Sequence, residues 1–253
     1  MNDSGAALAT VDLCKNFGAL RVAREVNFIL PHGCRHALIG PNGSGKTTLI
    51  NLIGGALAPT SGKIFLEGED ITGLSADQRV SRGLVRTFQI NTLFPRLTPI
   101  EAVTMAVAQR RGIGASLWRS LKRSSDTIDE AYEILTQLHL AEDCDRPTAQ
   151  LAYGRQRLLE IALALAAKPK VLLLDEPAAG VPQQQSGEIL AVISALPDDI
   201  AVLFIEHDID LVFRFAERIT VLVAGRILCE GTPAEIAADP EVRRIYLGDE
   251  VHV

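Results

Sequence analysis

Short apolar runs alternate along the chain with longer segments in which apolar residues recur at helical spacing. Several short runs are almost continuous in apolar side chains, which is typical of strands that are covered on both faces. Strands that alternate with helices predict an α/β fold. The predicted strands are residues 34–39, 63–66, 84–88, 171–174, 201–205 and 218–223.

Three helices have recognisable starts. Ser75, Thr98 and Thr232 are each followed three residues later by Glu or Gln, and such pairs can satisfy each other's backbone N–H groups. Proline follows Thr98 and Thr232 directly, at the first helical position, where its missing N–H costs nothing. From about Ile90 to Ala166 the pattern is helical, without a convincing strand, which predicts a helical insert between two α/β segments.

Composition narrows the class of protein. The chain has 253 residues, 47% of them hydrophobic, and this indicates a globular protein with a large core. The formal net charge of −6 disfavours nucleic acid as a partner. The four cysteines form no CxxC pair, which favours a reducing cytosol without a zinc or redox motif. The first ten residues show no signal peptide, and the apolar runs are too short to span a bilayer.

The strongest local motif is a phosphate-binding loop of the Walker A type between a predicted strand and a predicted helix. Glycines let backbone N–H groups surround a phosphate, the helix start adds its dipole, Lys46 adds charge, and Thr47 offers an oxygen to Mg²⁺. The alternative is a glycine-rich turn with an exposed lysine, but the strand and helix on the correct sides favour a nucleotide site. The candidate nucleotide-binding residues here are Gly40, Pro41, Asn42, Gly43, Ser44, Gly45, Lys46, Thr47 and Thr48.

Two acids, Asp175 and Glu176, follow the apolar run 171–174. In open α/β sheets ligands bind beyond the carboxyl ends of strands, so these acids and the phosphate loop can face one site. Asp175 would hold Mg²⁺ and Glu176 would orient or deprotonate the attacking water. The alternative is that two acids merely solvate a strand tip. Gln89 and His207 also end strand patterns, where each is either a γ-phosphate contact or an ordinary turn residue.

The order of these motifs resembles the ATP-binding subunits of ABC transporters: the phosphate loop, Gln89, "LAYGR", "LLLDEP" and "IEHD". The resemblance implies a P-loop NTPase core with a mostly parallel sheet, an antiparallel β portion near the N-terminus and an inserted helical subdomain. It implies a single domain of residues 1–253, with 1–89 and 167–253 as the nucleotide-binding core and 90–166 as the helical signature subdomain. It also implies that Phe17 stacks on adenine, although a lone Phe in such a strand is more often part of the core.

The stretch Leu151, Ala152, Tyr153, Gly154 and Arg155 occupies the place of that family's LSGGQ signature. The helix it begins has no Ser, Thr, Asp or Asn as N-cap, and a start with bare N–H groups suits an anion. In the family two subunits meet head to tail, so the anion would be the γ-phosphate of the partner's ATP. Ala152, Tyr153 and Arg155 depart from the family's Ser, Gly and Gln, and Pro182 replaces its usual Asp or Asn. We therefore expect the composite site that uses this signature to be the weaker one.

A narrower resemblance, in "VRTFQ", "LDEPAAG", "IEHDIDLV" and "IYLGD", is to the branched-chain amino acid import ATPases. Importers of urea, amides and other small organic solutes are similar. The resemblance implies an ATPase that couples hydrolysis of ATP with Mg²⁺ to solute uptake, with Glu176, His207 and Gln89 as catalytic residues and Thr47, Gln89 and Asp175 at the metal. The implied partners are membrane permease subunits, a second ABC ATPase (a paralogue or the chain itself) and, indirectly, a periplasmic or extracellular solute-binding protein. The implied location is peripheral, at the cytoplasmic face of the inner (cell) membrane.

Two other classes of protein share parts of this pattern. A soluble ABC ATPase of repair, translation or assembly usually carries two ATPase halves, coiled-coil arms or basic extensions, and none is visible in this sequence. A small-molecule kinase shares the phosphate loop but would not explain "LAYGRQ" or His207.

The middle segment offers two candidate contact surfaces. The resemblance implies that it docks a short helix of the permease near residues 90–94 and Trp118. The basic residues of 110–123 are either a solvated loop or a contact with the permease or an anionic membrane face. They are Arg110, Arg111, Arg119, Lys122 and Arg123.

Overall fold

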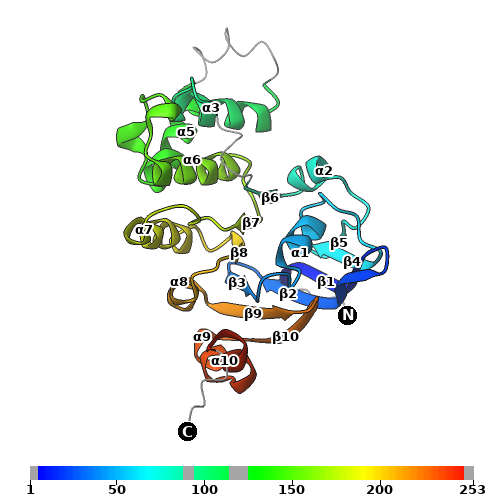
Figure 1. The fold of residues 1–253 in the computed structure, drawn as a ribbon. Helices are drawn as coiled ribbons and strands as arrows, with labels where there is room; N and C mark the ends of the chain where they lie inside the picture. Colours follow the sequence, from blue (N-terminus) through cyan, green and yellow to red (C-terminus); the bar gives the residue numbers. More distant parts are fainter. Residues whose placement is uncertain (1–4, 88–93, 114–124, 248–253) are drawn as a thin grey trace.

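The structure, a computed structural model, describes residues 5–87, 94–113 and 125–247 (Figure 1). A six-stranded sheet has the order β10-β9-β3-β8-β7-β6, in which β9, β3, β8, β7 and β6 are parallel and β10 is antiparallel to β9. Its strands are β3 (Arg35–Ile39), β6 (Leu84–Arg86), β7 (Val171–Asp175), β8 (Ala201–Ile205), β9 (Arg218–Val223) and β10 (Arg226–Gly231). The α/β fold with a mostly parallel sheet is therefore confirmed.

Register within this sheet fixes where its strands end. Leu38 of β3 and Asp175 of β7 both pair with Ile205 of β8. The three strands therefore finish at one level, and the loops that follow them leave the same edge of the sheet. The phosphate loop and the acid pair are brought to one site in this way.

A second sheet has the order β2-β1-β4-β5 and is antiparallel, which confirms the predicted β portion near the N-terminus. Its strands are β1 (Ala6–Phe17), β2 (Leu20–Pro31), β4 (Ser61–Leu66) and β5 (Glu69–Asp70). Helix α1 (Lys46–Ile53) shares one apolar core with both sheets, in which Leu49 and Ile53 lie with Phe28 of β2 and Leu203 of β8. The start of α1 is therefore held rigidly between the sheets.

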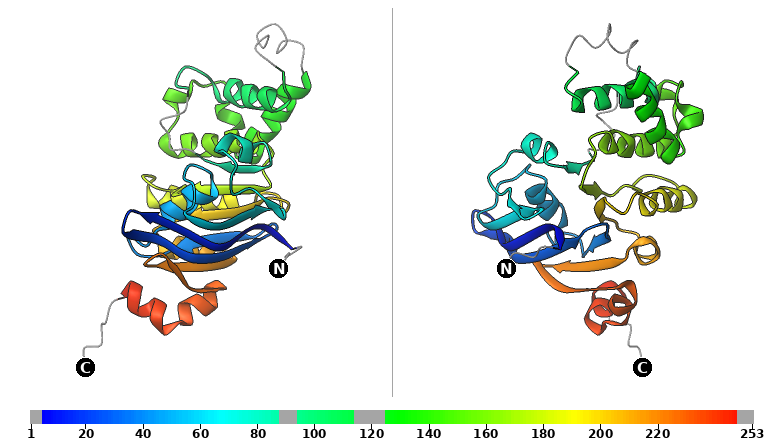
Figure 2. Two further views of the ribbon diagram at one scale, coloured as in Figure 1. Left: turned by 90° about the vertical axis from the view of Figure 1, so that its right-hand side faces the viewer. Right: turned by 180° about the vertical axis from the view of Figure 1, so that it is seen from behind.

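The described residues of the segment 99–165 form helices joined by turns, without a strand, and the segment lies at one end of the molecule (Figures 1 and 2). Its last helix, α6, joins it to the core because Leu159 and Ala162 pack in one cluster with Leu172 and Leu174 of β7. This segment holds α3 (Pro99–Arg110), α5 (Ser125–Gln137), the short 3₁₀ turns η3 (Ala141–Asp143) and η4 (Thr148–Gln150), and α6 (Tyr153–Leu165).

The remaining helices lie outside the segment 99–165, and the last two of them end the described chain. They are α2 (Ala76–Val80), α7 (Gln183–Ser194), α8 (Ile209–Phe215), α9 (Pro233–Ala238) and α10 (Pro240–Leu247), and α9 and α10 lie at the end of the molecule opposite α3 (Figure 2). All three predicted capping boxes, at Ser75, Thr98 and Thr232, are formed. Among the described helices, none is long and apolar enough to cross a bilayer.

Candidate functional site

The phosphate loop joins β3 to α1 and can be built only with glycine at two of its positions. A Cβ on Gly40 would lie 2.1 Å from the carbonyl oxygen of Leu222, inside the distance of any real contact. Gly45 caps α1 in the left-handed conformation with φ 107°, and a Cβ there would lie 2.8 Å from the carbonyl oxygen of Val22. Neighbouring strands therefore press on the loop from outside and fix its inward curvature.

Two polar side chains of the loop are buried inside it. Lys46 is 6% exposed, and its Nζ donates to the carbonyl oxygens of Gly40 (2.8 Å) and Pro41 (3.3 Å). Burial lowers the pKa of Lys46, although the carboxylates of Glu176 and Asp175 oppose that shift. Ser44 is 3% exposed, and its Oγ has no hydrogen-bond partner among the described residues. An orphaned hydroxyl and a buried ammonium beside the start of a helix fit a phosphate group.

The predicted catalytic acid and the predicted γ-phosphate contact lie together. Glu176 has φ 52°, and its N–H donates to the carbonyl oxygen of Ile205, so β8 positions the residue that follows β7. His207, which follows β8, has its Nε2 2.7 Å from Oε1 of Glu176. Both side chains are partly exposed, at 51% for His207 and 39% for Glu176, and so remain open to a ligand. Gln89, predicted for the same site, lies outside the described residues.

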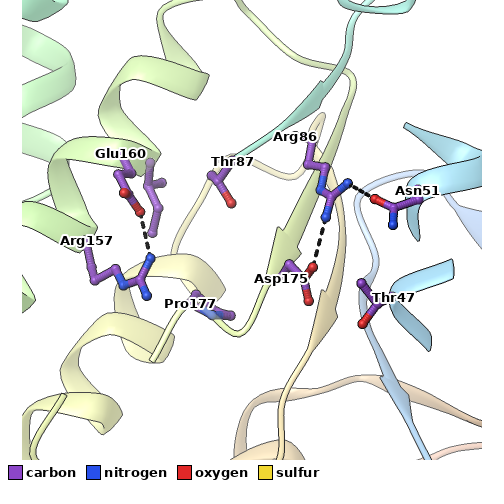
Figure 3. Close-up of a pocket in the computed structure, with 9 residues that line it drawn as sticks. Thr47, Asn51, Arg86, Thr87, Arg157, Glu160, Asp175 and Pro177 are labelled. Carbon is purple, nitrogen blue, oxygen red and sulfur yellow. Dashed lines mark hydrogen bonds and ion pairs between the residues drawn. The ribbon is translucent and has the colours of Figure 1, made fainter. Parts of the chain in front are cut away.

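Asp175 has a partner that sequence reasoning missed. Its Oδ2 accepts a hydrogen bond of 2.9 Å from Nη2 of Arg86, the last residue of β6, and Nη1 of Arg86 donates to Oδ1 of Asn51 on α1 (Figure 3). Arg86 stands in "VRTFQ", beside the predicted Gln89, but nothing local in the sequence indicates a contact with an acid 89 residues away. The pair closes one wall of a cavity of about 290 Å³ that Thr47 also lines.

A second residue that sequence reasoning missed, the acid Glu206, supports the same edge of the sheet. Glu206 is buried, and its carboxylate accepts hydrogen bonds from the backbone N–H groups of Ala178 (2.8 Å) and His207 (3.3 Å). Burial is the main cause that raises the pKa of Glu206. The sequence signal that could have identified Glu206 is its position directly after a fully apolar strand. Glu206 thus ties the loop after Glu176 to the end of β8 and positions both Glu176 and His207.

The start of α6 matches the prediction of an uncapped helix. Ala152 is the N-cap residue and makes no side-chain capping bond. The replaced signature residues are held within the chain: Arg155 donates to the carbonyl oxygen of His139 and lies 3.4 Å from Oδ2 of Asp143. Tyr153 accepts a hydrogen bond of 3.1 Å from Arg157. Arg155 therefore shares the carboxylate of Asp143 with Arg146, which lies 3.1 Å from Oδ1, and its guanidinium is held within its own chain.

The remaining predicted residues fall into four groups. Phe17 ends β1 with 48% of its surface exposed, and Nζ of Lys15 lies over its ring, 5.1 Å from the ring centroid. Pro182 is the N-cap residue of α7. Arg110 and Arg111 both pair with Glu130 of α5, at 2.7 and 2.6 Å, so one carboxylate is shared between the first two arginines of the basic stretch. Residues 90–93, Trp118, Arg119, Lys122 and Arg123 lie outside the described residues.

Comparison with known proteins places the chain in a family. A family model described as "ABC transporter" matches residues 23–179, and one described as "Branched-chain amino acid ATP-binding cassette transporter" matches residues 226–252. The chain is 37% identical to BraF of Pseudomonas aeruginosa (94% of this chain, 96% of that protein) and 38% identical to LivG of Escherichia coli strain K12 (96% and 98%). Both relatives are named high-affinity branched-chain amino acid transport ATP-binding proteins.

Solved structures agree with this assignment. The ADP conformation of MJ1267, an ATP-binding cassette of an ABC transporter, superimposes with a TM-score of 0.83 at 32% identity, over 96% of this chain and 99% of that chain. A dimeric, post-hydrolysis structure of the cassette MJ0796 with ADP and Pi superimposes with a TM-score of 0.73 at 26% identity, over 89% and 98%. The chain therefore belongs to the ATP-binding subunits of ABC transporters, a family of nucleotide-binding ATPases coupled to transport.

Proposed function

We propose that the chain binds ATP at the carboxyl edge of the six-stranded sheet and hydrolyses it there with water as the nucleophile. The observation that carries the proposal is the convergence of Lys46, Asp175 and the Glu176–His207 pair on that one edge. The phosphate loop, from Gly40 to Thr48, would cradle the phosphates, and Phe17 would stack on the base. Glu176 would polarise the attacking water. His207 would hold the side chain of Glu176 in place and would also contact the γ-phosphate.

Metal binding is assigned to Thr47, Asp175 and Gln89. A Mg²⁺ ion there would neutralise charge on the β- and γ-phosphates. The fit rests on hard oxygen donors: the carboxylate of Asp175 and the hydroxyl of Thr47 line one cavity. Asp175 is held at its place by β7, and Thr47 is held at its place by the first turn of α1.

We further propose that the hydrolytic site is shared between two ATPase subunits. The start of α6 has no side-chain cap, and the stretch Leu151 to Arg155 that leads into it would face the γ-phosphate of a partner's ATP. The dimeric structure of MJ0796 with ADP and Pi supports such a pairing. In this proposal residues 1–89 and 167–253 form the nucleotide-binding core, and 90–166 form the signature subdomain that would contact the permease.

The solute is proposed from the relatives. Their names and the match over residues 226–252 favour import of branched-chain or related amino acids, ahead of urea, amides or another small organic solute. The partners would be membrane permease subunits, a second ABC ATPase, and a periplasmic or extracellular solute-binding protein. The chain would then lie peripherally on the cytoplasmic face of the cell membrane.

The test is affinity purification of the tagged full chain from gently solubilised native membranes, with mass spectrometry of the proteins recovered. We expect a polytopic permease and a second ATPase, and the ligand of an associated solute-binding protein would identify the solute. The permease complex is then assayed for ATP-driven uptake of radiolabelled leucine, and separately of urea. Recovery of soluble partners alone would contradict the transport assignment and favour the soluble class of ABC ATPases.

A further inference from the structure

The ion pair between Arg86 and Asp175 is not used by the proposed function, and it conflicts with part of it. Asp175 is the carboxylate assigned to the metal, yet its Oδ2 accepts a hydrogen bond from Arg86 at 2.9 Å. The two side chains are only 19% and 16% exposed, so solvent screens the pair weakly. A guanidinium and a divalent cation therefore compete for one carboxylate.

This competition has a direction. A cation beside a carboxylate lowers its affinity for a further cation, because the favourable charge is already balanced and the two cations repel. Arg86 also donates to Asn51, so the guanidinium is aligned by β6, α1 and β7 together. Metal binding at Asp175 is then opposed for as long as Arg86 stays in this position.

The opposite wall of the same cavity offers Arg86 another acceptor. Glu160 of α6 is 7% exposed, and its Oε2 accepts a hydrogen bond of 3.0 Å from Arg157. Its Oε1 is buried and has no partner among the described residues, and the same holds for Nε of Arg86. Figure 3 shows Arg86 with Asp175 on one side of the cavity and Glu160 with Arg157 on the other. The cavity of about 290 Å³ leaves room for a guanidinium to move between them.

We propose that Arg86 is an exchangeable positioning residue, which holds Asp175 in the absence of the metal and turns toward the unpaired oxygen of Glu160 when the metal binds. The inference rests on the proposed nucleotide and metal site. In its second position Arg86 would link β6 of the core to α6, whose first turn carries the signature residues. Metal binding in one part of the chain would thereby be communicated to the helix that faces the partner's ATP.

The experiment is a double-mutant cycle on the full chain, with a fluorescent ATP analogue as the probe. Its Kd is measured with excess Mg²⁺ and again with EDTA, and the ratio of the two constants is the metal enhancement. A neighbouring cation changes the proton affinity of a carboxylate by about one to three powers of ten, so we expect Arg86→Gln to raise the enhancement roughly tenfold. In the wild-type background, Glu160→Gln should lower the metal enhancement severalfold. In the Arg86→Gln background, the same substitution should leave the metal enhancement unchanged.

Controls separate this proposal from loss of fold and from failure of the proposed function. Arg82→Gln removes an arginine from the turn before β6 that pairs with Glu69 at the surface, and it should leave the enhancement unchanged. Arg86→Lys keeps the charge and should stay near the wild type, and thermal unfolding of each variant verifies folding. An unchanged or lowered enhancement in Arg86→Gln, or an equal effect of Glu160→Gln in both backgrounds, would overturn the proposal. Absence of nucleotide binding in the wild type under both conditions would instead reject the nucleotide site itself.

Discussion

The phosphate loop and the start of α6 are both helix N-termini without a side-chain cap, yet their surroundings differ. At the loop, the buried hydroxyl of Ser44 has no partner among the described residues, and the ammonium of Lys46 donates to the carbonyl oxygens of Gly40 and Pro41. At the start of α6, Arg155 and Tyr153 are bonded within their own chain. In the proposed function, the first site binds an anion by itself, whereas the second offers mainly its backbone and requires a partner subunit. Damage to the two sites should therefore appear in different measurements.

Loss of the catalytic acid should have the largest effect. Glu176→Gln keeps the shape of the side chain but removes the base, so hydrolysis by the reconstituted complex should fall about a thousandfold, within the range for general-base catalysis. ATP binding should persist, and an ATP-bound closed pair of subunits should accumulate. Phosphate release measures the first effect and gel filtration with ATP the second. Glu188→Gln on the exposed face of α7 is the matched control, and wild-type turnover in Glu176→Gln would refute the assignment.

One substitution in each site tests whether the phosphate loop and the start of α6 are separate sites. Lys46→Ala should weaken binding of a fluorescent ATP analogue to the isolated chain roughly a hundredfold, because a buried charge-assisted contact is lost. Gly154→Asp should leave that binding unchanged and abolish hydrolysis in the assembled complex, because it places a negative charge beside the partner's phosphate.

Gly154→Ala is the control for the side-chain volume that Gly154→Asp adds. Its Cβ would meet only the flexible end of Gln185 at 3.1 Å and a methyl of Val181 at 3.6 Å, so the signature helix should tolerate it. Equal loss of ATP binding in Lys46→Ala and Gly154→Asp would show that the two ends are not separate sites.

Restoring the missing hydroxyl of the signature should have a smaller effect. Ala152→Ser supplies the absent N-cap, which contributes about 1 kcal/mol and so about 2–4 °C in unfolding temperature for a chain of this size. It also gives a donor to the partner's phosphate, so single-turnover hydrolysis at the site that uses this signature should rise severalfold. Equal single-turnover rates at the two composite sites of the wild type would contradict the view that this site is the weaker one.

The smallest expected effect is a pH dependence at Glu206. Because burial raises its pKa, the folded state binds this proton more tightly than the unfolded state does. The protonated acid therefore favours folding at low pH, and that contribution is lost as the pH rises through the folded-state pKa. Glu206→Gln cannot ionise, so its unfolding temperature relative to the wild type should increase by about 2 °C between roughly pH 5 and pH 8. A constant difference across that range would contradict a raised pKa of Glu206 in the folded state.

The sequence predicted the parts of the fold whose signals are local. The apolar run 171–174 became β7 with one further residue, and the Ser75, Thr98 and Thr232 boxes cap helices as expected. Strands β1 and β2 have no clean alternation, because the register shifts between Thr10 and Leu13 and because Asp12 and Glu25 take positive φ. Only the family resemblance indicated that part of the fold.

The candidate site likewise contains residues that local sequence signals predicted and residues that they did not predict. Strand ends and the glycine pattern placed Lys46, Asp175 and Glu176 from the sequence alone, because the edge of a parallel sheet is a predictable location. The partners that tune these residues could not be predicted. Arg86 reaches Asp175 only because β6 and β7 are neighbours in the sheet, and Glu206 reaches Ala178 only because the parallel strands β7 and β8 end at one level.

In the proposed function, Glu176 couples ATP hydrolysis to solute import in one complex. The most direct measurement is phosphate release and uptake of radiolabelled leucine in the same proteoliposomes, prepared from the purified complex with the wild-type chain or with Glu176→Gln. We expect phosphate release and leucine uptake both to require ATP with Mg²⁺ in the wild type, and both to be lost together in Glu176→Gln. Phosphate release at the wild-type rate in Glu176→Gln, or uptake that continues without it, would contradict the claim.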